Sequence, residues 1–397
     1  MALTTVSSER LSTNVKNTNF TSAEKQDLTD DIKPLLGSSG GGSKNKIING
    51  AMLVAQRGTS STSLQYQTVD RFKAFWTGQD EHPTQAQGDV AAGTTPYTLG
   101  FRKTFKLTNG NQTSGADAAD YFIVRTLLEA QDIANSGWNY VSSSSNITLS
   151  FWIKSSVAQN FYGNVQTKDG TVYNYPFETG SLSANTWTKI TKTIPGNSNL
   201  QFDNNADEGL RINIYPLLGT DYTASSVTLN QWATFSGSTQ TPDQTTTWWT
   251  TDDATLEITG MQLEVGSVAT DFEHRSFAQE LALCQRYHYV LCEAADKSIG
   301  NGTYYIGTSV FCPIRFPVTM RSAPSMTVAV DPGDSINYYA WFRNNGSNQE
   351  KGDNWSFIYG GVTGGEIYDP AASGTQSHSC FGRTLNANAK ISFSAEL

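Results

Sequence analysis

Residues 146–155 alternate apolar and polar side chains with a period of two, and this pattern constrains the fold more than any other feature of the chain. One parity holds Ile147, Leu149, Phe151 and Ile153, and the other holds Thr148, Ser150, Trp152 and Lys154. Successive side chains of a strand point to opposite sides, so the segment predicts a strand with one face in a core and the other in water.

The same alternation recurs along residues 46–272, for example in 209–218 and 254–266. In the second of these segments the alternation shifts by one residue. The apolar residues Leu256 and Ile258 are at even-numbered positions, whereas Met261 and Leu263 are at odd-numbered positions. Gly260 lies at the slip and predicts a β-bulge that re-aims the strand. About eight such strands indicate a β-sandwich, for which a jelly roll is the commonest closed form.

Composition agrees with a mainly β protein, because only 16% of the residues are charged while Gly alone contributes 34 of the 397 residues. Gly, Ser, Thr and Asn suit short strands joined by turns. The net charge is −9, and Lys and Arg form no cluster along the sequence. Nucleic acid is therefore excluded as a partner. No segment resembles a signal peptide or reaches the length of a transmembrane span, so we expect no membrane insertion.

All four cysteines lie in the last third of the chain and have no CxxC spacing. They predict buried, reduced thiols in a protein made in a reducing cytosol. The alternative is a zinc site that uses a histidine of the same region. The residues concerned are Cys284, Cys292, Cys312, Cys380, His288 and His378.

The first 45 residues are predicted to form a docking helix and a linker. Thr21 and Glu24 have the spacing of a capping box, and Gly and Ser fill residues 37–43. A single apolar stripe follows the helical period, and it consists of Leu28, Ile32, Leu35 and Leu36. A short helix cannot bury such a stripe alone, so it docks either on a partner, which the linker favours, or on its own β domain.

Residues 276–292 predict a short helical strut that leads into a new strand. Ser276 and Gln279 resemble a capping box, and Phe277, Leu281 and Cys284 keep helical spacing. Residues 293–397 then predict a second, smaller β-sandwich. The predicted organisation is thus 1–45 helix and linker, 46–275 jelly roll, 276–292 strut and 293–397 C-terminal sandwich.

Several segments together resemble the tail-fibre and appendage proteins of tailed bacteriophages. They are IINGAMLVAQRG (47–58), VDRF (69–72), FPVTMRSAPSMTV (316–328) and the stretch from QLEVGSVATDFEHRS to CQRY (262–287). The strands LSFWIKSS, NTWTKITKTI and ATLEITGMQLEVG resemble those of carbohydrate-binding jelly rolls. The resemblance implies a virion structural protein whose N-terminal helix attaches to other virion proteins and whose β domains bind a host-surface glycan.

The same resemblance implies a homotrimer on the virion surface, made in the cytoplasm of the bacterial host. It leaves open whether the N-terminal helix joins the tail adaptor or tube, or the capsid. A capsid decoration or head-fibre protein that stabilises the shell is therefore the alternative. The resemblance implies no catalytic residue in this chain, since the residues of the shared motif have a structural role. Arg286 is expected to pair with Glu273 or Glu280, and Phe272 to cover an edge of the sandwich.

Aromatic side chains on the polar parity of strands or in polar loops are the candidate sugar contacts, because sugar rings stack on aromatic faces. Trp152 is at one of the positions of its strand that are predicted to face solvent. Polar, loop-like settings hold Trp248, Trp249, Trp138 and Tyr140, whereas Trp187 is expected in the core.

An enzyme that cleaves glycans needs two carboxylates roughly 5 to 9.5 Å apart. The candidate pairs are Asp80–Glu81, Asp207–Glu208 and Asp252–Asp253, and all three have the composition of turns. A glycan depolymerase tailspike is therefore only a second alternative to a non-enzymatic protein. Asp203, Asn205 and Asp207 are spaced like the start of a calcium loop, but the following residues depart from that pattern. We expect no metal and no cofactor.

Overall fold

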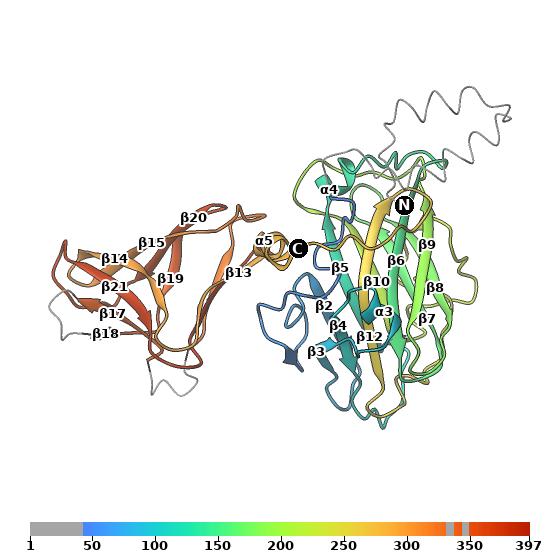
Figure 1. The fold of residues 1–397 in the computed structure, drawn as a ribbon, viewed down its shortest axis with the longest axis horizontal. Helices are drawn as coiled ribbons and strands as arrows, with labels where there is room; N and C mark the ends of the chain where they lie inside the picture. The colour runs from blue at the N-terminus through green and yellow to red at the C-terminus, as the bar shows by residue number, and fades with distance from the viewer. Residues whose placement is uncertain (1–42, 331–336, 344–348) are drawn as a thin grey trace, which may run out of the picture. The chain divides into compact units, whose positions relative to one another are not determined.

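The computed structural model describes residues 43–330, 337–343 and 349–397 (Figure 1). Residues Asn45–Leu397 form one compact unit. The predicted docking helix, with Leu28, Ile32, Leu35 and Leu36, lies outside the described residues. The unit Asn45–Leu397 is mainly β, as expected.

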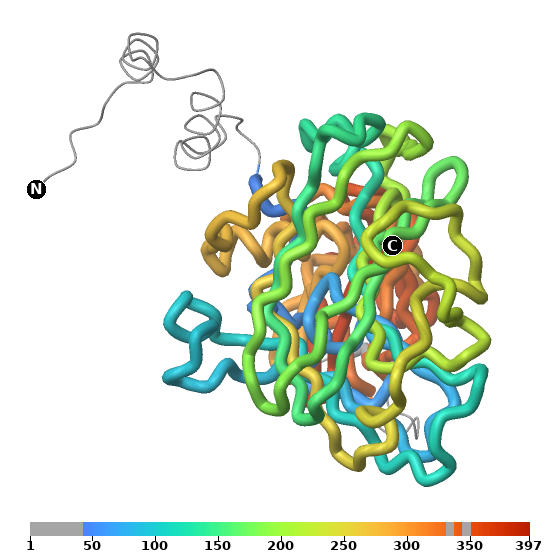
Figure 2. Tube along the Cα trace, turned by 90° about the vertical axis from the view of Figure 1, so that its right-hand side faces the viewer, coloured from blue at the N-terminus to red at the C-terminus, as the bar shows by residue number. Residues whose placement is uncertain are grey.

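Two six-stranded antiparallel sheets are built from residues 60–265. The β6 sheet has the order β1 (Ser60–Ser61), β3 (Thr84–Asp89), β4 (Lys103–Thr108), β12 (Thr255–Val265), β6 (Asn146–Ser155) and β9 (Thr188–Pro195). The β10 sheet has the order β11 (Ala233–Thr234), β8 (Tyr173–Ser181), β7 (Asn160–Thr167), β10 (Glu208–Leu218), β5 (Tyr121–Glu129) and β2 (Phe72–Thr77). Short helices α3 (Thr95–Thr98) and α4 (Ala130–Ala134) lie in the connections. The strands of the two sheets run in similar directions (Figures 1 and 2).

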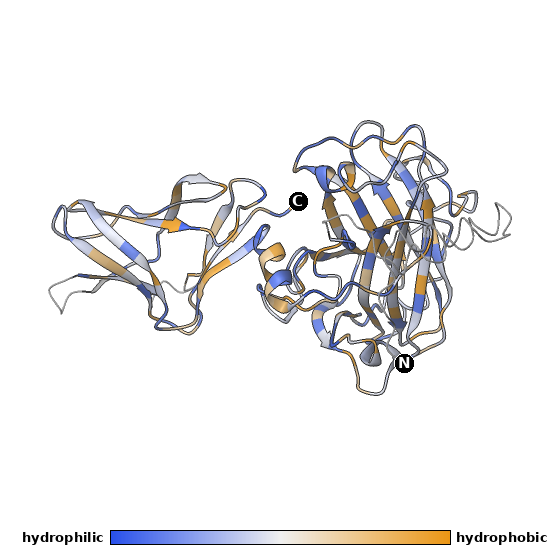
Figure 3. Ribbon diagram, turned by 45° about the horizontal axis from the view of Figure 1, so that its top comes forward, coloured by the Kyte–Doolittle hydropathy of each residue, from blue (hydrophilic) through white to orange (hydrophobic). Residues whose placement is uncertain are grey.

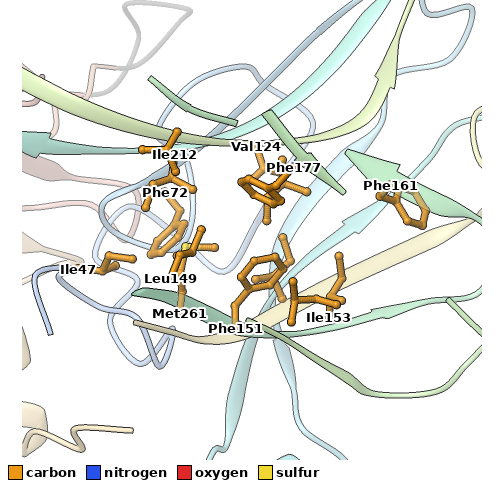
Figure 4. Packing of buried hydrophobic residues seen from close by; sticks show 14 of the residues in the cluster. Ile47, Phe72, Val124, Leu149, Phe151, Ile153, Phe161, Phe177, Ile212 and Met261 are labelled. Atoms are coloured by element: carbon orange, nitrogen blue, oxygen red, sulfur yellow. The ribbon is translucent and has the colours of Figure 1, made fainter. Parts of the chain in front are cut away.

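The apolar parity of these strands fills one core between the sheets, which confirms the predicted sandwich. Leu149, Phe151 and Ile153 of β6 meet Val124 of β5 and Ile212 of β10 in this core (Figure 4). Hydrophobic and hydrophilic bands consequently alternate along the strands (Figure 3). Each fully buried large apolar side chain contributes about 1.5–3 kcal/mol, so the alternation determines which side of every strand faces inward.

The predicted bulge in β12 is confirmed. The register of β12 against β6 shifts between Thr259 and Gln262, and Gly260 has a φ of +62°. An added Cβ at Gly260 would lie 2.6 Å from Cζ of Phe101, so both the backbone and the space favour glycine there.

Beyond the bulge, the motif residues have the folding roles that the resemblance implied. Glu264 accepts hydrogen bonds from the backbone N–H and the hydroxyl of Thr270, at 2.9 and 2.6 Å. Gln262 accepts one from the backbone N–H of Glu273 at 2.9 Å, and Glu273 accepts one from the N–H of Asn45 at 2.7 Å. These contacts fold the turn after β12 back onto the start of the unit.

The helix predicted after this turn is α5 (Phe277–Gln285), and its capping box between Ser276 and Gln279 is confirmed. The predicted apolar face is partly wrong. Phe277 is 57% exposed, whereas Glu280 and Cys284 are buried. Glu280 tolerates burial because it accepts a hydrogen bond from the backbone N–H of Asn49 and pairs with Arg275.

Residues 288–394 form the expected second sandwich, from a three-stranded and a seven-stranded sheet. The first has the order β13 (His288–Glu293), β22 (Lys390–Ser394) and β16 (Ser325–Val328). The second has the order β18 (Gln349–Lys351), β17 (Tyr339–Arg343), β21 (Ser379–Thr384), β14 (Ser298–Ile306), β15 (Ser309–Arg315), β20 (Gly364–Asp369) and β19 (Ser356–Gly361). A separate core of aromatic and cysteine side chains joins them. All four cysteines are free and buried, as predicted.

Buried charges join the first sandwich to α5 and the strands that follow it. Glu129 at the end of β5 is fully buried, and it accepts hydrogen bonds from Nε and Nη2 of Arg286 at 2.7 and 2.8 Å and from the hydroxyl of Tyr287 at 2.5 Å. The expected pairing of Arg286 with Glu273 or Glu280 is wrong, because Arg275 pairs with both of those carboxylates instead. Burial favours the neutral form of Glu129, but the hydrogen bonds from Arg286 and Tyr287 outweigh it and lower the pKa of this carboxyl.

Arg71 completes this junction from the strand β2 side. Its guanidinium lies 3.5 Å from the ring centre of Tyr287, pairs with Glu396, and donates to the carbonyl of Leu127 at 2.7 Å. Arg71 is 2% exposed, so its charge is stable only because these partners surround it.

Among the described residues, no helix is long and apolar enough to cross a membrane.

Replacing Glu129 with Gln removes the carboxylate and leaves the half-buried Arg286 without its partner. We expect the free energy of unfolding to fall by about 3 kcal/mol, as for other broken buried pairs. Denaturant titration of the purified chain measures this. Lys103→Gln is the matched control, since the bridge from Lys103 to Asp89 is exposed and its loss changes stability by at most about 0.5 kcal/mol. Equal effects of the two variants would contradict this account of the junction.

His288 makes stability depend on pH. Its ring is 4% exposed, and neither ring nitrogen makes a hydrogen bond within the described residues. Burial, with Arg57 and Lys390 nearby, lowers the pKa of His288 from 6.5 to about 3. The unfolded chain therefore binds a proton that the folded chain does not, and stability present above pH 6.5 is lost as the pH falls toward 3.

We expect the wild type to lose about 2 kcal/mol more than His288→Gln between pH 7 and pH 5, measured by denaturant titration at both values. His82→Gln is the control because His82 is exposed. A pH dependence that is unchanged in His288→Gln would show that the buried imidazole does not titrate in this range.

Candidate functional site

The outward face of the β10 sheet carries polar and aromatic side chains in ordered rows, although its strands are otherwise apolar. Strands β2, β5, β10 and β7 lie side by side in this sheet, so residues in register form rows across it. The aromatic row contains Phe75, which is opposite Ile123, and Tyr215, which is opposite Tyr162, and the register of β10 against β5 shifts at this row. The adjacent polar row contains Lys73, Arg125, Asn213 and Asn164, and the third contains Leu127, Arg211, Gln166 and Asn174.

A chain of hydrogen bonds links the middle of the polar row. Nε of Arg125 donates to Oδ1 of Asn213 at 2.6 Å, and Nδ2 of Asn213 donates to Oδ1 of Asn164 at 2.6 Å. Asn213 and Asn164 are 1% and 0% exposed. Within the described residues, Nδ2 of Asn164 and Oδ1 of Asn174 make no hydrogen bond. Buried amides with unused groups are uncommon in folded proteins.

Half-buried aromatic rings lie beside this polar row. The rings of Phe75 and Tyr121 pack edge to face with centres 6.0 Å apart, and those of Tyr121 and Tyr222 do so at 5.7 Å. Phe75 also lies 4.7 Å from the guanidinium of Arg125. Phe75, Tyr121, Tyr162 and Tyr222 are each partly exposed.

The connection between β10 and β12 crosses part of the same face. The carbonyl of Gln240 accepts a hydrogen bond from Nδ2 of Asn174 at 2.9 Å, and its side-chain oxygen accepts one from the hydroxyl of Tyr215 at 3.3 Å. Tyr215 is consequently fully buried, and burial raises the pKa of its phenol. This segment therefore covers the β8 end of the face and leaves the β2 and β5 end more open.

The electrostatics of the face are dominated by cations. Burial and the neighbouring Arg211 lower the pKa of Arg125 to about 10. Burial and the neighbouring Arg125 lower the pKa of Lys73 to about 8. Arg211 is neutralised by Glu208, whose Oε2 lies 2.7 Å from Nη2 of Arg211. Among the described residues, no group of three or more His, Cys, Asp or Glu side chains is arranged to hold a metal ion.

The tryptophans expected in polar loops lie elsewhere and do not form one site. The predicted exposure of Trp248, Trp249 and Trp138 is wrong, since they are 0%, 0% and 3% exposed in the sandwich core. Their indole N–H groups donate to the carbonyls of Thr255, Gly115 and Ser145 respectively, which satisfies the one polar atom of each ring. A buried indole with a satisfied N–H presents no surface to a sugar.

Trp152 does face outward from the β6 sheet, as its parity predicts, and it is partly exposed beside Phe101 and Phe272. Tyr140 is also partly exposed and packs on Phe202. Glycan contact at these two residues stays a prediction. Trp187 was expected in the core, but it is partly exposed and lies 5.2 Å from the ammonium group of Lys154.

The carboxylate pairs considered for catalysis serve as turn or ion-pair partners. Asp80 accepts a hydrogen bond from the backbone N–H of Ser114 at 2.7 Å, and Glu81 accepts one from that of Asn111 at 2.8 Å. Glu208 pairs with Arg211, whereas Asp207 lies 3.8 Å from Arg321. Asp252 and Asp253 lie in an exposed turn before β12.

No protein-family model matches the sequence, and a search of curated proteins finds no similar sequence. Among solved structures, the enzymatically active domain of tailspike protein 4 of bacteriophage CBA120 is similar at a TM-score of 0.30 and 10% identity, over 56% of this chain and 22% of that chain. The N-terminal tandem of two carbohydrate-binding modules of family 22 from Paenibacillus barcinonensis has a TM-score of 0.25 at 9% identity, over 90% of this chain and 100% of that chain.

The N-terminal cellulose-binding domain of a β-1,4-glucanase from Cellulomonas fimi also has a TM-score of 0.25, at 11% identity, over 54% of this chain and 99% of that chain. The chain thus spans less than a quarter of the tailspike domain's length. Likenesses at these TM-scores carry no argument about function, which is therefore argued from the residues of the outward face.

Proposed function

We propose that this chain binds a host-surface glycan through the outward face of the β10 sheet and does not cleave it. The observation that carries the proposal is the pairing of an aromatic row with a polar row whose outer members are partly exposed, on one sheet face. Half-buried rings of Phe75, Tyr121 and Tyr162 offer stacking surfaces for pyranose rings, and the partly exposed Lys73 and Arg125 lie beside them. Sugar sites combine these two kinds of group.

We further propose that the chain is part of a virion appendage such as a tail fibre. The segments that resemble tail-fibre proteins support this, and so do the hydrogen bonds of Gln262, Glu264 and Glu273, which give the motif a structural role. An N-terminal segment that anchors to other virion proteins and a trimeric assembly are part of the same proposal.

Weak single sites favour such an assembly. Burying one aromatic face of about 100 Å² contributes at most about 2.5 kcal/mol, which corresponds to a Kd weaker than about 10 mM even before entropy costs are counted. Three linked copies raise the avidity by about 10² to 10⁴, provided that the surface spaces its glycans suitably.

Substitution of Tyr162 by Ala tests the location of the site. We expect binding to immobilised host-surface polysaccharides, measured by surface plasmon resonance with the full chain, to weaken about tenfold because one stacking surface is lost. Phe277→Ala is the matched control, since Phe277 is an exposed ring on α5. The proposal fails if Tyr162→Ala binds like the wild type while Trp152→Ala abolishes binding, because the site would then lie on the β6 sheet.

A further inference from the structure

The outward face of the β10 sheet is chemically divided along its strands. The aromatic row lies toward Tyr121 and Tyr222, and the carboxylates at that end include Glu178, opposite Tyr162, and Asp243, which accepts a hydrogen bond from Thr223. The other end carries four cations, and they come from four different elements. They are Lys73 of β2, Arg125 of β5, Arg211 of β10 and Lys168 at the end of β7.

These four residues are called here the cation cluster, and carboxylates also lie at this end, since Glu208 and Glu396 act on Lys73 and Asp169 follows Lys168. Glu208 binds Arg211 through both carboxylate oxygens. Within the described residues, neither Arg125 nor Lys168 forms an ion pair, and Lys73 contacts the main-chain oxygen of Leu397 at 3.3 Å.

The cations also repel one another. Lys73 and Arg125 are directly opposite in the register of β2 and β5, and both are partly buried. The lowered pKa values of Lys73 and Arg125 have the same origin, namely burial and the neighbouring positive charge. Buried charges are stable when they are paired, so an anion bound between them would remove an existing electrostatic penalty.

We propose that the glycan bound by this face is acidic, and that its carboxylate lies at the cation cluster while neutral rings stack on the aromatic row. The inference rests on the proposed glycan-binding function and assigns the substrate class of that site. Nε of Arg125 is engaged by Asn213, which orients the guanidinium, and its remaining N–H groups suit the two oxygens of a carboxylate.

The decisive probe is a set of acidic bacterial polysaccharides, each presented beside its carboxyl-reduced form. The two forms share linkages and rings and differ only in the carboxylate. We expect the full chain to bind at least one acidic form about tenfold more tightly than its reduced counterpart, with a preference that shrinks at high salt.

Lys73→Gln and Arg125→Gln identify the residues, and each should abolish the preference while leaving binding to the reduced form. Lys189→Gln is the control, because Lys189 is exposed on the outward side of β9 in the other sheet and its loss changes the net charge equally. Two cation-cluster variants keep the test informative if one of them fails to fold.

Equal binding of acidic and reduced forms would overturn the inference and leave the proposed function standing. A preference lost equally in Lys189→Gln and Lys73→Gln would also overturn it, since general charge attraction would then explain the result. Absence of binding to every polysaccharide would overturn the inference and the proposed function together.

Discussion

The burial of one parity of each strand in a single core is the constraint on which the rest of this structure depends. Leu149, Phe151 and Ile153 cannot enter the core unless the residues between them face outward. In the β10 sheet the same constraint places Tyr162, Arg125 and Asn213 on the outward side. A register shift of one residue in any of these strands would turn its core side chains outward and its outward side chains into the core. The same alternation therefore determines both the stability of the sandwich and the composition of the candidate site.

The second constraint is the set of buried charges at the junction with α5. Glu129 ends β5, the strand that also carries Arg125, and it is held by Arg286 and Tyr287. The junction therefore fixes the end of a strand that contributes to the candidate site. Arg71 immediately precedes β2, whose Lys73 belongs to the cation cluster, and its guanidinium lies over the ring of Tyr287. The contacts that attach the later residues to the first sandwich thus also support the cationic end of its outward face.

Local signals in the sequence predicted local features well. Alternation predicted β6, the parity slip predicted the bulge at Gly260, and Ser276 with Gln279 predicted the start of α5. Long-range partners were not accessible in this way. Arg286 pairs with Glu129, which is 157 residues away, and the nearer candidates Glu273 and Glu280 pair with Arg275. A charged side chain carries no sequence signal that identifies a partner from another sheet.

The residues of the candidate site likewise could not be predicted from local sequence patterns. Trp248 and Trp249 lie in a segment rich in Thr and Asp, and this composition predicted exposure, yet backbone carbonyls satisfy both indoles inside the core. The residues of the outward face come from strands separated by up to about 140 positions, so only the sheet order brings them together. Their one signal in the sequence was the polar parity of 160–167 and 121–129, where aromatic and amide residues occupy the positions that face away from the core.

A crystal structure of the chain with a bound acidic oligosaccharide would test the central claim most directly. The account predicts sugar rings stacked on Tyr162 or Phe75 and a carboxylate within hydrogen-bond distance of Arg125. Sugar density against Trp152 on the β6 sheet, with the outward face of the β10 sheet empty, would contradict it.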